Sequence, residues 1–138
     1  MGKALAIDYG KVRCGLAETD DLKIIASGLP TVQTLELFSF LSNYLKINSV
    51  DELVIGQPLD LKGNLSPIES DILKFIEKFK IEFPTVNVFR LDERFTSKMA
   101  SFFISQSGKS KKKRQDKGLI DKVSATIILQ NFLEKKLK

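Results

Sequence analysis

The pattern of apolar and polar positions in the first quarter of the chain predicts three strands. Residues 4–7 form a short apolar run without a charge, which is typical of a strand buried on both faces. A turn containing Gly10 joins this run to a second segment over 12–18, so the two are expected to pair as a hairpin. Residues 23–32 alternate loosely and contain Pro30, which favours an edge strand or the end of a strand. We therefore expect an antiparallel run of three strands.

Helical and strand periodicities alternate through the rest of the chain. The pattern predicts, in chain order, a helix over 34–46, a strand over 53–56, a helix over 66–83, a strand over 86–89, a short helix over 96–105 and a last helix from near 118 to the C-terminus. Thr34 and Thr96 are placed to cap two of these helices, and Ser66 with Glu69 has the form of a capping box. Helices and strands that alternate after a meander predict an α/β fold. The expected architecture is a mixed five-stranded sheet (three antiparallel strands, then two parallel) flanked by helices.

Length and composition favour one domain over residues 1–138, which is enough chain to bury a core. No apolar run reaches the length of a membrane span, and the start of the chain lacks the basic and apolar regions of a signal peptide. The single cysteine, Cys14, cannot form an internal disulfide and is expected in the core of the second strand. These features favour a cytoplasmic location.

The absence of histidine narrows the possible chemistry. Histidine-based triads and the usual zinc sites are excluded, so any reaction would have to use carboxylates, lysine, arginine or hydroxyl groups.

The excess positive charge is confined to one segment. Residues 109–117 contain six basic residues and one acid, whereas the rest of the chain contains 16 of each, and the net charge is +5. Such a cluster favours binding to a polyanion, because each neutralised phosphate releases counterions. The alternative is a solvated loop that only keeps the protein soluble.

Asp8 is the first candidate for chemistry, because it stands where a buried strand leaves the core. An ionised carboxylate beside a core costs several kcal/mol unless something compensates its charge. A metal cation is one compensation, and hydrogen bonds from the amides of its own turn are the other.

Three further acids stand at comparable places. Asp92 and Glu93 follow the last predicted strand, at the edge where open α/β sheets place their sites. Asp121 shares a helical stripe with the apolar Ala125 and Ile128, although an acid in a first helical turn is also favoured by the macrodipole. Together with Asp8 these acids are a candidate site for Mg²⁺ or Mn²⁺, which prefer oxygen ligands. Two such ions can activate water and stabilise the leaving oxygen in phosphodiester cleavage.

Four motifs in order along the chain resemble those of the YqgF (RuvX) family. They are Ile7-Asp8-Tyr9-Gly10-Lys11 with Arg13 and Gly15; Val54-Ile55-Gly56-Gln57-Pro58 with Gly63 and Ser66; Asp92-Glu93-Arg94-Phe95-Thr96; and Lys117-Gly118-Leu119-Ile120-Asp121 followed by Ile127-Ile128-Leu129-Gln130. The chain departs from the family pattern at Gln57, where the family usually has an apolar residue, and at Ser124, where it usually has alanine. The resemblance covers nearly the whole chain.

The resemblance implies a ribonuclease H-like fold and a nuclease. Members of the family are described as Holliday junction resolvases or as nucleases that mature the 5′ end of pre-16S rRNA. The acidic site of the family corresponds to Asp8, Glu93 and Asp121, with Asp92 as an alternative to Glu93. The expected nucleic-acid-binding residues are Gly10, Lys11, Arg13, Arg94, Lys111, Lys112, Lys113 and Arg114. The glycine would let backbone approach a phosphate, and the cations would contact the nucleic-acid backbone or are plain surface charge.

The sequence leaves the partner and two other functions open. The substrate is precursor rRNA or branched DNA, and the protein is a monomer or a homodimer, since symmetric resolution of a junction needs two active sites. A second function is a nucleic-acid-binding factor in rRNA maturation or transcription whose acids have no catalytic role. A third starts from Asp8, Gly10 and Gly15, which also resemble the phosphate loop of actin-like ATPases and sugar kinases. Those proteins need two such domains, and this chain has the length of one.

Overall fold

The computed structural model describes residues 2–60, 62–92 and 117–136, and in its last helix the side chains of residues 122–135. The described elements are, in chain order, β1 (Lys3–Asp8), β2 (Arg13–Thr19), β3 (Ala26–Gln33), the 3-10 helix η1 (Thr34–Glu36), α1 (Leu37–Ile47), β4 (Val50–Gln57), α2 (Glu69–Glu82), β5 (Asn87–Asp92) and α5 (Lys117–Lys136). The short helix expected over 96–105 and most of the basic segment lie outside the described residues.

The strands form one five-stranded sheet in the order β3-β2-β1-β4-β5. The central strand β1 pairs with β2 antiparallel and with β4 parallel, and β5 pairs with β4 parallel. The predicted mixed sheet is therefore confirmed, as is the edge position of the strand that contains Pro30. Opposite Gly15, β3 has an extra residue, because Leu29 pairs with Leu16 and Val32 with Cys14. Pro30 and Thr31 thus form a β-bulge in the edge strand.

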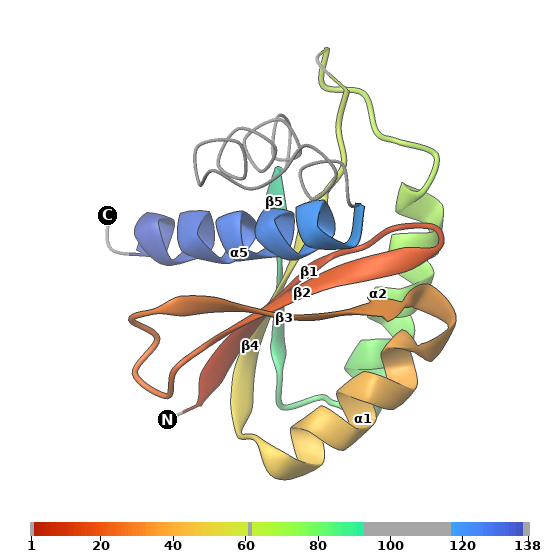
Figure 1. Ribbon diagram of the computed structural model, residues 1–138. Coiled ribbons are helices and arrows are strands. Elements are labelled where there is room, and N and C mark those ends of the chain that lie inside the picture. Colours follow the sequence, from red (N-terminus) through yellow and green to blue (C-terminus); the bar gives the residue numbers. More distant parts are fainter. Residues whose placement is uncertain (1, 61, 93–116, 137–138) are drawn as a thin grey trace.

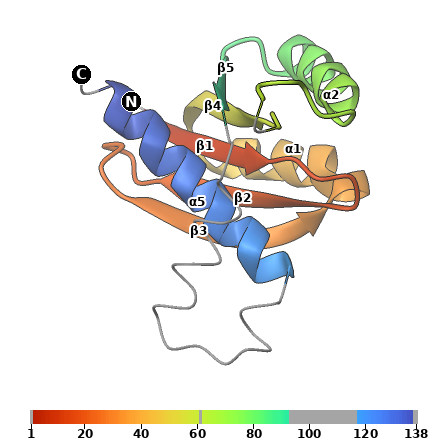
Figure 2. The same cartoon turned by 90° about the horizontal axis from the view of Figure 1, so that it is seen from above.

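Helices cover both faces of the sheet (Figures 1 and 2). Side chains of α1 and α2 pack on the face that carries Leu5 and Ile7 of β1, and buried Cys14 belongs to this core as predicted. Side chains of α5 pack on the other face, against Ala4 and Ala6 of β1. Since successive residues of a strand point to opposite faces, the chain uses large residues under α1 and α2 and small residues under α5.

The predicted cap at Thr34 is wrong, and the predicted capping box at Ser66 and Glu69 forms only in part. The Thr34 hydroxyl donates a hydrogen bond to the Gly10 carbonyl at 2.7 Å, and the cap positions of η1 and α1 are Gln33 and Glu36, neither with a side-chain cap bond. Before α2, the Ser66 hydroxyl accepts a long hydrogen bond of 3.5 Å from the Ile68 amide, as a cap would, but the Glu69 carboxylate binds Arg90 rather than the amide of Ser66. In both cases a partner more than 20 residues away replaces the local one.

Of the helices in the described residues, none combines the length and the apolar character that a membrane span requires.

Candidate functional site

Asp8 is the last residue of the central strand, as the sequence predicts. It pairs in register with Gly15 of β2, and it follows the pair formed by Ile7 and Ile55 of β4. Its side chain is half-buried and shares a strand face with Ala4 and Ala6, which pack under α5. Asp8 therefore belongs to the layer between the sheet and α5.

The turn after Asp8 is held in a fixed shape. A Cβ on Gly10 would lie 2.3 Å from the Arg13 carbonyl oxygen, so no other residue fits without moving backbone. Thr34 binds this turn twice, through its hydroxyl to Gly10 and through its amide to the Val12 carbonyl at 2.9 Å. The tight closure of the turn is thus enough to explain why residue 10 is a glycine. The expected contact of Gly10 with a phosphate stays a prediction.

The cations of this turn are accessible to different degrees. Lys11 is exposed, and Arg13 at the start of β2 is half-buried. On the other side of the turn the Tyr9 ring packs against Phe75 of α2 with ring centroids 5.8 Å apart, and burial raises the pKa of its phenol. The turn is therefore anchored to α2 through Tyr9 and presents Lys11 to solvent.

Asp92 is the last residue of β5. It lies at the same end of the sheet as Asp8, because β1, β4 and β5 are parallel. Strand β4 lies between them, which separates the two backbones by two strand spacings, about 10 Å. Asp92 and Arg90 share one face of β5, whereas Leu91 packs with the core under α5. By this alternation Asp92 lies on the α2 face, opposite to the face of Asp8.

Helix α5 contains Asp121, one turn before Ala125 and two turns before Ile128. Both of these side chains are buried against the sheet. The predicted helix and its apolar stripe are thus confirmed, and the side chain of Asp121 lies outside the described residues. Figure 1 shows α5 running with its first turns toward the end of the sheet at which β1 finishes.

The remaining predicted site residues, Glu93, Arg94, Lys111, Lys112, Lys113 and Arg114, also lie outside the described residues. Within the described part of the chain no three metal-ligating side chains meet. The carboxylate donors of the predicted set fit a hard divalent cation in their chemistry, since all are oxygen ligands. Of the predicted carboxylates, the structure describes the side chains of Asp8 and Asp92 and the backbone of Asp121.

Sequence reasoning missed a cluster of polar groups at the same edge. Arg90 of β5 donates hydrogen bonds to both carboxylate oxygens of Glu69, at 2.7 and 2.8 Å, and this pairing lowers the Glu69 pKa. Gln57 at the end of β4 has its amide nitrogen 3.5 Å from the same carboxylate. The sequence offered one indication of this cluster, the departure from the family pattern at Gln57. A polar residue at a usually apolar position indicates a polar neighbour in the fold.

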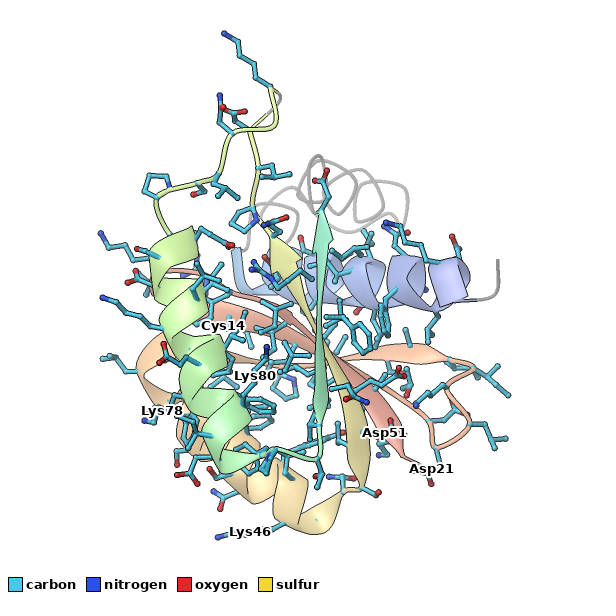
Figure 3. All side chains as sticks on the ribbon, turned by 180° about the vertical axis from the view of Figure 1, so that it is seen from behind. Cys14, Asp21, Lys46, Asp51, Lys78 and Lys80 are labelled. Carbon is cyan, nitrogen blue, oxygen red and sulfur yellow. The ribbon has the colours of Figure 1, made fainter. Side chains whose placement is uncertain are left out.

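A loop held by internal hydrogen bonds follows β4 and leads to the turn before α2; its described residues are 58–60 and 62–66. The Asp60 carboxylate accepts hydrogen bonds from the amides of Lys62 and Asn64, both at 2.8 Å, and Gly63 has a φ of 88°. Leu59 and Leu65 form a β-bridge across the loop. Figure 3 shows this loop projecting beyond the sheet on the side where β5 ends, with Asp21 and Asp51 at the opposite end of the molecule.

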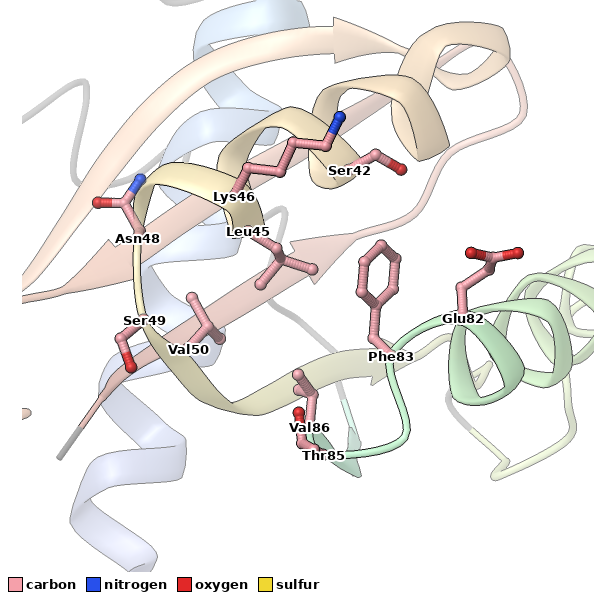
Figure 4. A pocket seen from close by; sticks show the side chains of 10 residues that line it. All are labelled: Ser42, Leu45, Lys46, Asn48, Ser49, Val50, Glu82, Phe83, Thr85 and Val86. Carbon is pink, nitrogen blue, oxygen red and sulfur yellow. The ribbon is translucent and has the colours of Figure 1, made fainter.

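A separate pocket of about 530 Å³ lies at the other end of the parallel strands (Figure 4). Its lining includes Asn48 and Val50 at the start of β4 and Val86 before β5. Its ionisable lining residues are Lys46 and Glu82, so it offers one carboxylate and is not a site for a hard divalent ion.

Comparison with known proteins gives a family match over nearly the whole chain. The family model described as "RuvX: Holliday junction resolvase" matches residues 2–135. Relatives named "Putative pre-16S rRNA nuclease" include those of Christiangramia forsetii, 49% identical over 96% of this chain and 98% of the relative, and Flavobacterium johnsoniae, 48% identical over 99% of each. The relative from Bacteroides fragilis is 44% identical over 99% of each chain.

One solved structure is similar in fold. It is the crystal structure of the fowlpox virus resolvase with substrate Holliday junction DNA, which matches 99% of both chains with a TM-score of 0.62 at 15% sequence identity. The predicted ribonuclease H-like arrangement of sheet and helices is confirmed by this similarity.

Proposed function

The chain belongs to the RuvX family, and from this premise we propose that it is a metal-dependent nuclease whose substrate is the 5′ end of pre-16S rRNA. The family and its enzyme class, a hydrolase acting on nucleic acid, agree with the expectation from the sequence motifs. The single observation that carries the rRNA substrate is the identity of 43–49% over nearly full length with relatives named for that activity. A cytoplasmic location is part of the proposal, because precursor rRNA is found there.

The proposed catalytic site consists of Asp8, Glu93 and Asp121, and these carboxylates would hold Mg²⁺ or Mn²⁺, as two ions. Bound ions of this kind activate water and stabilise the leaving oxygen. Asp8 supports the proposal by its place at the end of the central strand, on the face covered by α5. The same alternation favours Glu93 over Asp92 as the third acid, since Asp92 lies on the opposite face.

The remaining proposed residues would bind the substrate. Gly10 and Lys11 lie in the turn that follows Asp8, Arg13 begins β2, and the basic residues from Lys111 to Arg114 precede α5 in the chain. We propose that they contact backbone phosphates and so position the nucleic acid without reading its sequence.

A second candidate is the resolution of Holliday junctions. The description of the family model and the DNA in the related resolvase structure favour it. It requires a homodimer, because two strands are cut symmetrically, whereas trimming of rRNA is possible for a monomer.

The deciding experiment compares a 5′-extended 16S rRNA precursor with a four-way DNA junction, using purified protein with Mg²⁺ or Mn²⁺. Asp8→Asn and Asp121→Asn are expected to reduce cleavage at least about 100-fold, because each removes a charged ligand. The matched control is Asp21→Asn, an exposed acid at the opposite end of the sheet, which should cleave like the wild type.

Each outcome selects one function. Cleavage of the rRNA alone supports the proposal, and cleavage of the junction alone selects the resolvase. Tight binding of either substrate without cleavage would replace the nuclease by a binding factor. Full activity in Asp8→Asn would overturn the proposed catalytic site.

A further inference from the structure

Arg90 makes four hydrogen bonds that join three elements. Two go to the carboxylate of Glu69, at 2.7 and 2.8 Å, and two go to the carbonyl oxygens of Ile55 and Gly56, both at 3.2 Å. We call this set the Arg90 clamp: the guanidinium of β5, the first residue of α2 and the last carbonyls of β4 before Gln57. The Glu69 side chain is 7% exposed and that of Arg90 is 23% exposed, so both charges are largely removed from water.

The clamp lies near the end of the sheet at which Asp8 stands. Arg90 is two residues before Asp92, where β5 ends. It holds β5 to the end of β4, and β4 in turn pairs with the central strand that carries Asp8. A shift of β5 along β4 would therefore move the end of β5, where Asp92 stands, relative to Asp8.

The same clamp closes the base of the 58–66 loop. The chain leaves β4 at Gln57 and returns to the fold at Glu69, and these two side chains approach each other to 3.5 Å. Arg90 thus binds the Gly56 carbonyl just before the connection starts and the Glu69 carboxylate where it ends.

Stability alone does not require this pair of charges. A largely buried ion pair can often be replaced by apolar residues of similar volume without loss of stability, because its attraction only offsets the cost of removing both charges from water. The guanidinium differs from an apolar substitute in its planar array of donors, which fixes the angles and distances of four acceptors at once. Compared with an apolar contact, the Arg90 clamp therefore fixes the position of β5 relative to β4 and α2 more narrowly.

We propose that Arg90 and Glu69 are positioning residues that fix the end of β5 against β4, and with it the point from which the chain continues to the proposed ligand Glu93. The pair thereby sets the rate of cleavage and the affinity for Mn²⁺, and it leaves the affinity for nucleic acid unchanged. This inference rests on the proposed nuclease function and adds residues that have no place in the four family motifs.

The test uses a double variant, Arg90→Met with Glu69→Leu, which removes both charges and leaves no buried ion unpaired. We expect kcat to fall at least tenfold and the affinity for Mn²⁺, measured by water proton relaxation, to fall at least threefold. The dissociation constant for the substrate, measured in EDTA, should stay within twofold of the wild-type value. Arg90→Lys keeps the cation, loses the planar fork and should have an intermediate kcat.

The matched control is a second ion pair, at the other end of β4. Lys23 lies 2.9 Å from Glu52 of β4, whose side chain is 8% exposed and therefore as buried as that of Glu69. Lys23→Met with Glu52→Leu should retain the wild-type kcat and Mn²⁺ affinity. An equal loss of kcat in this control would show a general effect of destabilisation and overturn the positioning role.

The outcomes separate the two proposals. If the wild-type protein cleaves and the Arg90 and Glu69 double variant cleaves at the same rate, the positioning role is overturned and the nuclease function stands. If the wild-type protein cleaves neither substrate, the nuclease function is overturned. In that case the Mn²⁺ measurement decides: unchanged affinity in the double variant overturns the positioning role, and a threefold loss supports it.

Discussion

The Glu69 carboxylate depends on Arg90 for its charged state. Hydrogen bonds from Arg90 are the main reason that the Glu69 pKa lies below its ordinary value of 4.5, and burial acts in the opposite direction. A carboxyl group whose pKa is lower in the folded protein stabilises the fold above the pKa of the unfolded chain. That contribution disappears as the pH falls through the folded-state pKa, where the group is protonated in both states.

Glu69→Gln should therefore be less stable than the wild type at pH 7, by about 1.5–3 kcal/mol for the removal of a charge-assisted pair. The difference in the free energy of unfolding should narrow steadily as the pH falls below 4.5. Urea unfolding between pH 7 and pH 3 measures it. Glu77→Gln, at an exposed position of α2, is the control and should change stability by less than about 0.5 kcal/mol. A difference for Glu69→Gln that stays constant down to pH 3 would contradict this assignment.

Thr34 provides a second prediction for a single residue. Thr34→Val removes the hydroxyl that donates to the Gly10 carbonyl and should cost about 0.5–1.5 kcal/mol in urea unfolding. Cleavage should fall several-fold as well, since the turn follows Asp8 directly. Thr34→Ser retains the hydroxyl and should behave like the wild type in both measurements. Equal stability of the valine and serine variants would exclude a role for this hydrogen bond.

Single residues also show the limit of prediction from the sequence. The place of Asp8 at the end of a buried strand was predictable, because a run of apolar residues ends there. The partners of Thr34 and Glu69 were not, because local capping rules consider only the neighbouring amides. Their bonds reach across 24 and 21 residues, and they depend on which strands become neighbours in the sheet.

At the level of elements, the contact between α5 and the sheet is the most sensitive. The sheet presents small residues to this helix: Ala4, Ala6 and Ala17 are fully buried there, and a Cβ on Gly28 would lie 2.7 Å from carbons of the Lys122 side chain. Small residues let the helix approach the sheet closely, and the packing leaves no room for a longer side chain. The position of α5, and of Asp121 within it, therefore depends on these residues.

Ala6→Leu should destabilise the protein by about 1–3 kcal/mol through overpacking. It should also reduce kcat, since it displaces the helix that contains Asp121. Ile76→Val in α2 is the control, because it costs about 0.5–1.5 kcal/mol on the opposite face without moving α5. Chemical denaturation together with a cleavage assay separates the two effects. A wild-type kcat in Ala6→Leu would mean that the position of α5 is not critical.

The elements themselves were largely predictable, and their ends were not. The apolar run over 53–56 marks only the part of β4 that is buried on both faces, whereas the strand extends over Val50–Gln57 because β1 and β5 both supply hydrogen-bond partners. Strand β3 begins at Ala26, later than the predicted 23, because the Asp20 carboxylate binds the amides of Ile24 and Ile25 in the turn. The sheet faces on which Asp8 and Asp92 lie could be assigned only from the position of α5 in the structure.

At the scale of the whole molecule, the positive charge is distributed unevenly. Two cations at the end away from Asp8 are paired with acids: Lys3 with Glu18 at 3.3 Å, and Lys23 with Asp51 at 2.7 Å and with Glu52. Paired cations release few counterions when a polyanion approaches. The net charge of +5 comes from residues 109–117, so nucleic acid should be attracted mainly to that segment.

Replacement of Lys111, Lys112, Lys113 and Arg114 by glutamine should weaken binding to all nucleic acids alike. The slope of log K against log salt concentration should decrease by up to about 4, one for each phosphate that the variant no longer neutralises. The control replaces the same number of cations, Lys46, Lys74, Lys78 and Lys80, on exposed positions of α1 and α2, and should leave the slope unchanged. Equal slopes in the wild type and the first variant would identify the segment as a solvated loop.

The bulge at Pro30 has a consequence for how copies of this protein can associate. An exposed edge strand can recruit the strand of another molecule and extend the sheet without limit, a route to fibrous aggregates. Pro30 lacks the amide hydrogen that such an extension needs, and the bulge with Thr31 interrupts the regular spacing of the remaining donors. Extension of the sheet along β3 is therefore obstructed, and a dimer that cuts a junction would have to assemble through another surface.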